Sequence, residues 1–135
     1  MARWVIRSQA EFEARHALTT YLGEPEEPHS HRWRVELRIG TERLGAEGYA
    51  VDFHAVHAAL REVVEPLDGT DLNAHPEIGS PTPSAERLAQ VLAASLAPAI
   101  RRLDATTLSV SVWEGDDNRV DLLLDGIEAD SVDPD

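Results

Sequence analysis

Residues 29–39 read HSHRWRVELRI, so that aromatic or apolar side chains alternate with polar ones. The odd-numbered residues share one face, whereas Arg32, Arg34 and Glu36 lie on the opposite face. Strict alternation of this kind is typical of a β-strand with one buried face. The stretch therefore predicts a half-buried strand that begins with two histidines, His29 and His31, on its apolar side.

A second alternation precedes this strand, over residues 3–16. Most of its apolar positions are even-numbered and its odd positions are mostly polar, and a segment rich in Gly, Pro and Glu, residues 21–28, separates the two runs. We expect these two runs to form neighbouring antiparallel strands with one solvent-exposed face, because a short connection joins two strands of the same pattern. Five residues of the first strand that fall on even positions define this face: Trp4, Ile6, Phe12, Ala14 and His16.

After Gly48 the spacing of the apolar residues changes from every second residue to the spacing of an α-helix. Asp52 is a good N-cap for an amphipathic helix that extends to about Glu65. A long loop, residues 68–81, separates it from a second helix that starts near Thr82 or Ser84 and continues through Ile100. Strands return at residues 107–113 and 119–124, and the turn chemistry of residues 115–118 joins them as a hairpin.

This order of elements predicts an α+β fold, a four-stranded antiparallel sheet with two helices on one face (ββααββ). Residues 1–125 form a single domain in this interpretation, and residues 126–135 form an acidic C-terminal tail. A small sheet with two free edges needs cover for them, and edge-to-edge assembly into a closed oligomeric β-barrel would provide it.

The composition excludes several classes of protein. The chain has 135 residues, a formal charge of −13 and no cysteine, which rules out disulfides, thiolate metal sites and thiol nucleophiles. The negative charge disfavours nucleic acids and anionic membranes as partners. The sequence shows neither a stretch long enough to span a membrane nor the apolar core of a signal peptide, so we expect a cytoplasmic protein.

Three histidines share the apolar parity of their strands. His16 ends the first strand, and His29 and His31 begin the second, so an antiparallel pairing brings the three imidazoles together. This is the geometry of a zinc site with one open position. The alternative is that they are polar residues at strand ends. His54 and His57 near the first helix start are expected to be solvated, and His75 in the long loop is a candidate acid or base.

Six short motifs follow one another along almost the whole chain. In this order and spacing they resemble the 6-pyruvoyl-tetrahydropterin synthase and 6-carboxytetrahydropterin synthase family. They are Phe12-x-Ala14-x-His16, His29-Ser30-His31, Gly48 with Val51-Asp52-Phe53, Leu67-Asp68 with Leu72-Asn73, Pro83-Ser84-Ala85-Glu86 and Val112-Trp113-Glu114.

The resemblance implies the T-fold, with subunits joined sheet to sheet as barrel trimers, commonly stacked into homohexamers, and with active sites at subunit interfaces. It implies zinc held by His16, His29 and His31, with the diol of 7,8-dihydroneopterin triphosphate at the open positions. Glu114 would anchor the pterin through paired N–H bonds. For Ser84 and Glu86 we place helix capping first and contact with the ligand second.

The chain departs from the family at two groups that transfer protons. The usual Cys before H-G-H is absent, and Gly69 stands where the family has a His. Asp68, Asp71 and His75 are possible substitutes for that imidazole. Glu26 fits a subgroup that carries E-x-x-H-G-H and cleaves the side chain to give 6-hydroxymethyl-7,8-dihydropterin. The alternative is that Glu24, Glu26 and Glu27 form a solvated acidic turn.

Three functions remain open from the sequence. The first is a zinc-dependent lyase acting on 7,8-dihydroneopterin triphosphate or a related dihydropterin, with Glu26 as base and Asp68 or His75 assisting. The second is a catalytically altered homolog that binds metal and a pterin or purine-like ligand without the usual turnover. The third is a structural zinc oligomer without a ligand.

Overall fold

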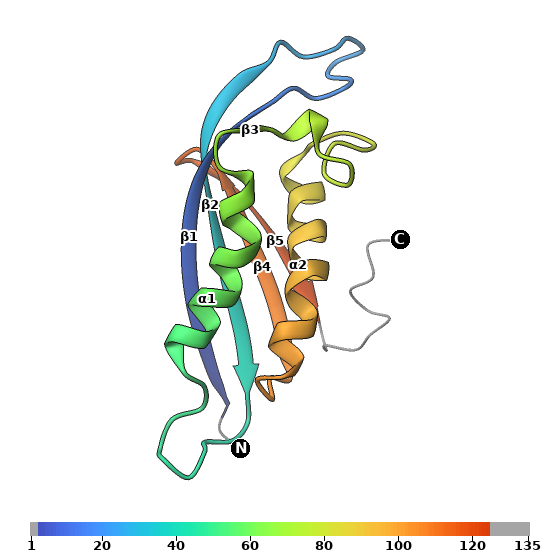
Figure 1. Cartoon of the computed structure of the whole chain (residues 1–135). Helices are drawn as coiled ribbons and strands as arrows, with labels where there is room; N and C mark the ends of the chain where they lie inside the picture. Colours follow the sequence, from blue (N-terminus) through green and yellow to red (C-terminus); the bar gives the residue numbers. More distant parts are fainter. Residues whose placement is uncertain (1–2, 125–135) are drawn as a thin grey trace.

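The computed structural model describes residues 3–124, so the expected acidic tail at residues 126–135 lies outside the described part (Figure 1). One sheet contains all five strands in the order β3-β1-β2-β4-β5. In chain order the elements are β1 (Trp4–His16), β2 (His29–Thr41), α1 (Phe53–Val64), the 3-10 turn η1 (Glu65–Leu67), β3 (Thr70–Asp71), the 3-10 turn η2 (Leu72–Ala74), α2 (Ala85–Arg101), β4 (Thr107–Glu114) and β5 (Asn118–Leu124).

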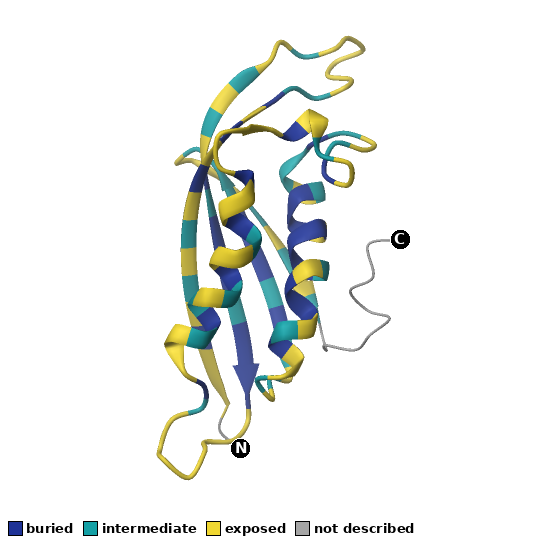
Figure 2. Cartoon of the chain, viewed as in Figure 1, coloured by how far each residue is buried: buried dark blue, intermediate teal, exposed yellow. Residues whose placement is uncertain are grey.

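Both helices cover the same face of the sheet, which confirms the α+β arrangement (Figure 1). Asp52 caps α1 by accepting a hydrogen bond from the His54 amide, and Ser84 caps α2 by accepting one from the Arg87 amide, as the sequence predicts. Buried residues alternate along β1 and recur at helical spacing on α1 and α2 (Figure 2). The core therefore lies between the sheet and the two helices.

The sheet has one strand more than the sequence predicts, and it is mixed rather than wholly antiparallel. Thr70 and Asp71 form β3, which pairs in parallel with Ala14 and Arg15 of β1. The Gly69 amide donates to the Glu13 carbonyl at 2.7 Å and starts this pairing. A strand of two residues is too short to show an alternating pattern. For this reason the sequence analysis assigned these two residues to the loop predicted over residues 68–81. The other four strands pair antiparallel as predicted.

A carboxylate is buried on the face of the sheet that the helices leave uncovered. The Glu36 side chain is 7% exposed and accepts hydrogen bonds from Gln9 at 2.7 Å, Arg7 at 2.8 Å and Arg38 at 3.2 Å. Burial alone would raise the pKa of Glu36, but these three donors outweigh it and lower that pKa. The ionised form of Glu36 therefore stabilises the folded sheet.

Glu36→Gln is expected to lower the free energy of unfolding at neutral pH by about 1–3 kcal/mol, because Arg38 loses its carboxylate partner at 3.2 Å and keeps only Asp121 at 4.0 Å. The pKa of Glu36 in the folded protein lies below its value in the unfolded chain, which is about 4.3. The ionised Glu36 carboxylate therefore contributes its full stabilisation above about pH 4.3, and this stabilisation is lost as the pH falls through the folded-state pKa. Urea unfolding at pH 7 and in acid measures this difference. The difference in unfolding free energy between wild type and Glu36→Gln should become smaller in acid. As a control, Glu62→Gln at an exposed position should change the unfolding free energy little. An equal difference between wild type and Glu36→Gln at both pH values would contradict the prediction.

Candidate metal centre

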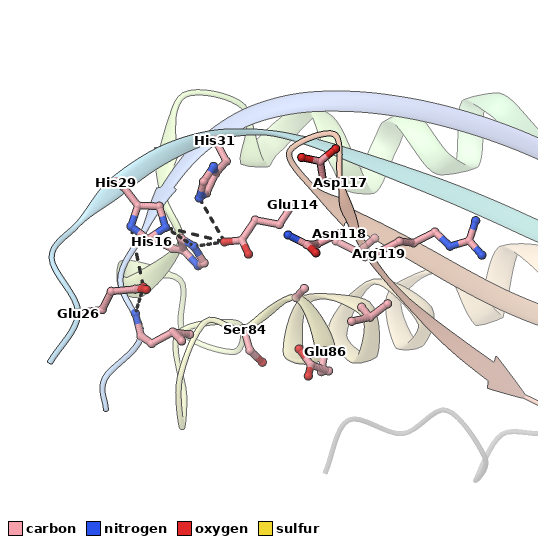
Figure 3. A pocket seen from close by; sticks show the side chains of 14 residues that line it. His16, Glu26, His29, His31, Ser84, Glu86, Glu114, Asp117, Asn118 and Arg119 are labelled. Atoms are coloured by element: carbon pink, nitrogen blue, oxygen red, sulfur yellow. Dashed lines mark hydrogen bonds and ion pairs between the residues drawn. The ribbon is translucent and has the colours of Figure 1, made fainter. Parts of the chain in front are cut away.

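The register of β1 and β2 brings three histidines to one end of the sheet. His16 pairs directly with His29, and His31 pairs with Ala14, two residues back along β1. Because side chains alternate between faces, all three rings lie on the helix side of the sheet (Figure 3). The ring centroid of His29 lies 4.7 Å from that of His16 and 4.4 Å from that of His31. The structure therefore brings the three predicted ligands together.

Backbone carbonyls fix the orientation of two of these rings. His16 Nδ1 donates to the Pro83 carbonyl at 2.8 Å, and His29 Nδ1 donates to the Glu27 carbonyl at 3.0 Å. Since a carbonyl can only accept, the proton of each neutral ring is on Nδ1 and the lone pair is on Nε2. Metal-binding histidines are usually held in this way by their second nitrogen.

Glu114 joins the three imidazoles from the end of β4. One carboxylate oxygen, Oε1, contacts His16 Nε2 and lies 3.3 Å from His31 Nε2 and 3.9 Å from His29 Nε2. One donor atom from each of the four side chains lies within 4.8 Å of all the others. Three imidazole nitrogens and one carboxylate oxygen therefore surround a common point.

The charges of this cluster are coupled. The hydrogen bond from His16 lowers the pKa of Glu114, although its burial opposes the change. Burial acts against the charged form of His16, but hydrogen bonds to Glu114 and to the Pro83 carbonyl raise its pKa. The pKa of His31 is lowered by burial and, despite the opposing attraction of Glu114, by the neighbouring His29 and His16. The carboxylate thus favours a positive charge among the rings.

The donor set fits a divalent metal ion. The Nε2 atoms of His16 and His29 lie 3.1 Å apart, and two ligands about 2.0–2.1 Å from a tetrahedral zinc are separated by roughly 3.3 Å. With both Nδ1 protons held by carbonyls, the two Nε2 atoms face each other and the Glu114 carboxylate. This position therefore favours a cation, which is a proton on His16 Nε2 in the metal-free form or a bound metal ion. Imidazole nitrogen with one carboxylate oxygen is a common combination at zinc sites.

A cavity of about 460 Å³ opens beside the imidazoles (Figure 3). Glu26 lines it, and its Oε1 accepts from the Leu18 amide at 3.0 Å and lies 3.9 Å from His29 Nδ1. Ser84 and Glu86 also line it from the start of α2. The Ser84 hydroxyl accepts from the Arg87 amide, so the expected capping role is present, and the side chain borders the cavity as well.

The other predicted proton-transfer groups lie elsewhere in the chain. Asp68 is exposed and accepts a hydrogen bond from the Glu13 amide, and Asp71 pairs with Arg15. His75 Nδ1 accepts from the amides of Glu77 and Ile78, within its own loop. Neither Asp68, Asp71 nor His75 lines the cavity within residues 3–124. The geometry of one chain gives their catalytic role no support.

Several residues that line the cavity were missed by reasoning from the sequence, and Asp117, Asn118 and Arg119 are the polar ones. Asp117 and Asn118 line the wall beyond Glu114, whereas the sequence assigned them only to a hairpin turn. The signal was available in the topology, because this turn begins directly after Glu114 and returns alongside the same end of the sheet. Neither His54 nor His57 lines the cavity formed by the described residues. His54 is exposed, as expected for a solvated residue, whereas His57 is half-buried and its ring contacts the Ser8 hydroxyl at 2.8 Å.

Comparison with known protein families identifies the family of this chain. The model of the 6-pyruvoyl tetrahydropterin synthase family matches residues 5–123. The chain belongs to this family. The match spans both histidine strands, both helices and the hairpin that carries Glu114, and it confirms the T-fold expected from the motifs.

Solved structures share the fold of this family member at low sequence identity. The 6-pyruvoyltetrahydropterin synthase of Plasmodium vivax superposes with a TM-score of 0.76 at 16% identity, covering 93% of this chain and 99% of that chain. The enzyme of Caenorhabditis elegans gives 0.77 at 14%, covering 91% and 96%. An uncharacterized protein of Wolinella succinogenes gives 0.75 at 17%, covering 91% and 99%. No curated protein matches the chain significantly by sequence.

Within residues 3–124, none of the helices combines the length and the apolar character needed to cross a membrane.

Proposed function

We propose that this chain binds a divalent metal ion, zinc in the first instance, through His16, His29 and His31, and that it acts as a lyase on 7,8-dihydroneopterin triphosphate or a related dihydropterin. The observation that supports the metal is the convergence of the Nε2 atoms of His16 and His29, 3.1 Å apart, on the Glu114 carboxylate, with each ring held by a carbonyl on its other nitrogen. Membership of the 6-pyruvoyl tetrahydropterin synthase family supports the substrate. We further propose a cytoplasmic location.

When bound, the metal would polarise the hydroxyls of the ligand's side chain and make the adjacent protons easier to remove. Glu26 is the proposed base that receives such a proton. Its carboxylate borders the cavity and is held next to His29 by the Leu18 amide. The Plasmodium vivax relative offers a parallel, because a glutamate-to-alanine form of it is described as a catalytic residue mutant.

Glu114 is the proposed anchor of the heterocycle, since a carboxylate can accept two parallel N–H bonds from an aminopyrimidine edge. In the structure its Oε1 lies against the imidazoles. Binding a pterin therefore requires Glu114 to turn away from the rings or to use its second oxygen. Ser84 and Glu86, on the opposite wall, are proposed as further contacts with the ligand.

Assembly into a barrel trimer, stacked into a homohexamer, is part of the same proposal. The sheet is open in a single chain, and β5 lies at one edge while β1 carries only the two-residue β3 at the other. Long unpaired strand edges favour pairing with another chain. A second subunit could also cover the open side of the cavity.

A second candidate function is a homolog that binds metal and a pterin or purine-like ligand without the usual turnover. Gly69 at the position of the family's His favours it, and so does the distance of Asp68 and His75 from the cavity within one chain. Loss of a general acid or base typically lowers a rate by about 100- to 10,000-fold.

Incubation of the zinc-loaded protein with 7,8-dihydroneopterin triphosphate, followed by chromatographic analysis of the pterin products, separates the two functions. A product with a shortened or rearranged side chain is expected for the lyase. Saturable pterin binding without product would establish the altered homolog instead. If the protein neither binds nor converts a dihydropterin, the lyase is wrong, and a homolog that binds a purine-like ligand or a structural zinc oligomer remains.

A further inference from the structure

The pairing of β1 with β2 ends at the first of the three histidines. His16 is the last residue of β1 and pairs with His29, the first residue of β2. The chain therefore leaves the sheet directly after a proposed metal ligand. Ala17, Leu18 and Thr19 follow, and each of them makes two hydrogen bonds with residues outside β2. These bonds, rather than the sheet, hold the backbone that leads away from His16.

Asn73 holds Ala17 on the side where β3 pairs with β1. Its Oδ1 accepts from the Ala17 amide at 2.8 Å, and its Nδ2 donates to the Ala17 carbonyl at 2.8 Å. A carboxamide offers the same donor and acceptor as a peptide group, so this side chain extends the pairing of β3 with Ala14 and Arg15 past the end of β1 (Figure 1). Asn73 belongs to η2, in which Leu72 is fully buried. The core therefore anchors the turn that carries this carboxamide.

Thr82 holds the chain two residues further on. Its Oγ1 accepts from the Thr19 amide at 2.9 Å, and the Thr19 hydroxyl donates to the Pro81 carbonyl at 3.2 Å. Pro83 follows Thr82 directly, and its carbonyl accepts from His16 Nδ1 at 2.8 Å. The carbonyl that orients the His16 ring therefore belongs to a segment that is itself tied to the backbone after His16.

Leu18 lies between these two contacts and holds the proposed base. Its amide donates to Glu26 Oε1 at 3.0 Å, and its carbonyl accepts from the Glu26 amide at 3.0 Å. A displacement of Leu18 would therefore move the Glu26 carboxylate as well as the ring of His16, two residues earlier. One short stretch of backbone, residues 16–19, thus places both a proposed metal ligand and the proposed base.

We propose that Asn73 and Thr82 are positioning residues of the metal centre. Both act through the backbone of residues 17–19, which they fix so that the His16 ring meets the Pro83 carbonyl and the Glu26 carboxylate stays beside the imidazoles. Partners that orient metal ligands typically contribute about 10- to 100-fold to metal affinity. The contacts of both residues lie within one chain, so they do not depend on assembly. This inference rests on the proposed function and extends it to two residues outside the donor set.

Asn73→Asp tests the first contact with almost no change of shape. The carboxylate can still accept from the Ala17 amide, but it offers no donor to the Ala17 carbonyl and places an oxygen against it. We expect the affinity for Zn²⁺, measured by competition with a chelator, to fall at least about tenfold. Gln90→Glu is the control, because it makes the same change from amide to acid at an exposed position of α2. It should leave the affinity within about twofold of wild type.

Thr82→Val and Thr82→Ser test the second contact as a pair. Valine has nearly the shape of threonine but no hydroxyl for the Thr19 amide, whereas serine keeps the hydroxyl. We expect Thr82→Val to lower the affinity for Zn²⁺ about tenfold and Thr82→Ser to stay within about threefold of wild type. A merely structural role would lower the melting temperature of the metal-free protein and leave the zinc affinity of the folded protein unchanged. An equal loss of affinity in both variants would show that the hydroxyl is not the cause.

Hydrogen exchange in the metal-free protein tests how these residues act. In wild type the Nδ1 proton of His16 should exchange slowly with solvent, as measured by NMR, because it is buried and hydrogen-bonded to the Pro83 carbonyl. Asn73→Asp and Thr82→Val should each speed this exchange at least about tenfold. The amide of Val35, in the buried middle of β2, should exchange as in wild type, since the change is local.

The outcomes separate this inference from the proposed function. Weaker zinc binding in Asn73→Asp and Thr82→Val, with faster exchange at His16 and unchanged exchange at Val35, supports both. Unchanged exchange at His16 overturns the inference whatever the zinc affinity, and zinc binding by the wild type then leaves the proposed function standing. If the wild type binds no zinc, the proposed function is wrong, and the exchange of the His16 proton alone decides whether Asn73 and Thr82 position that ring.

Discussion

His31→Ala is expected to abolish stoichiometric metal binding. Purified wild-type protein loaded with zinc should retain about one ion per chain, and the variant should retain close to none after the same dialysis. The expected loss of affinity exceeds about 100-fold, because changes that touch only the partners of metal ligands already lower affinity by about 10- to 100-fold. Elemental analysis gives the metal content, and competition with a chelator gives the affinity.

His31 separates metal binding from folding better than His16 does. The His16 side chain is 3% exposed and its Nδ1 donates to the Pro83 carbonyl, so truncation there would leave a buried acceptor without its donor. The His31 side chain is 32% exposed. We therefore expect the metal-free forms of wild type and His31→Ala to unfold at nearly the same temperature.

His54→Ala is the matched control, since it removes an exposed imidazole from the start of α1. Its metal content should equal that of the wild type. Unchanged metal content in His31→Ala would show that the three imidazoles do not hold the ion together, and the proposed lyase chemistry would lose its basis.

The histidine cluster was predictable because strand geometry has a period of two. Once β1 and β2 are antiparallel neighbours, equal parity sends His16, His29 and His31 to one face, and the short connection brings their ends together. The same reasoning predicted the order of the two helices and the four long strands, since the change from alternation to helical spacing after Gly48 is abrupt. The local pattern of apolar residues is sufficient to predict a helix or strand wherever one face of that element is buried.

The remainder of the site depends on contacts that no local pattern encodes. The carbonyls of Pro83 and Glu27 orient His16 and His29, and any residue can supply a backbone carbonyl. Residue Glu114 was predicted to bind a pterin, but its place among the imidazoles follows from where β4 ends against β2, opposite Trp33. The cavity likewise forms only because the turn at Asp117 approaches the start of α2.

Glu26→Gln is expected to lower turnover of a dihydropterin by about 100- to 10,000-fold, the usual effect of removing a general base. The amide oxygen of Gln can still accept from the Leu18 backbone amide, which the Glu26 carboxylate does at 3.0 Å. The segment that leads into His29 should therefore keep its conformation. Metal content and the affinity for a non-reacting pterin should stay within about threefold of wild type, whereas the first-order rate constant in single-turnover experiments should fall.

Glu24→Gln provides the control because it removes a neighbouring exposed carboxylate from the same acidic turn. If Glu24, Glu26 and Glu27 merely form a solvated turn, the two variants should react at equal rates, and another group must accept the proton. A fall confined to Glu26→Gln, with metal retained, identifies the carboxylate beside His29 as the base. In that case a carboxylate takes the place of the thiolate that a chain without cysteine cannot supply, which explains how the family's chemistry persists in this sequence.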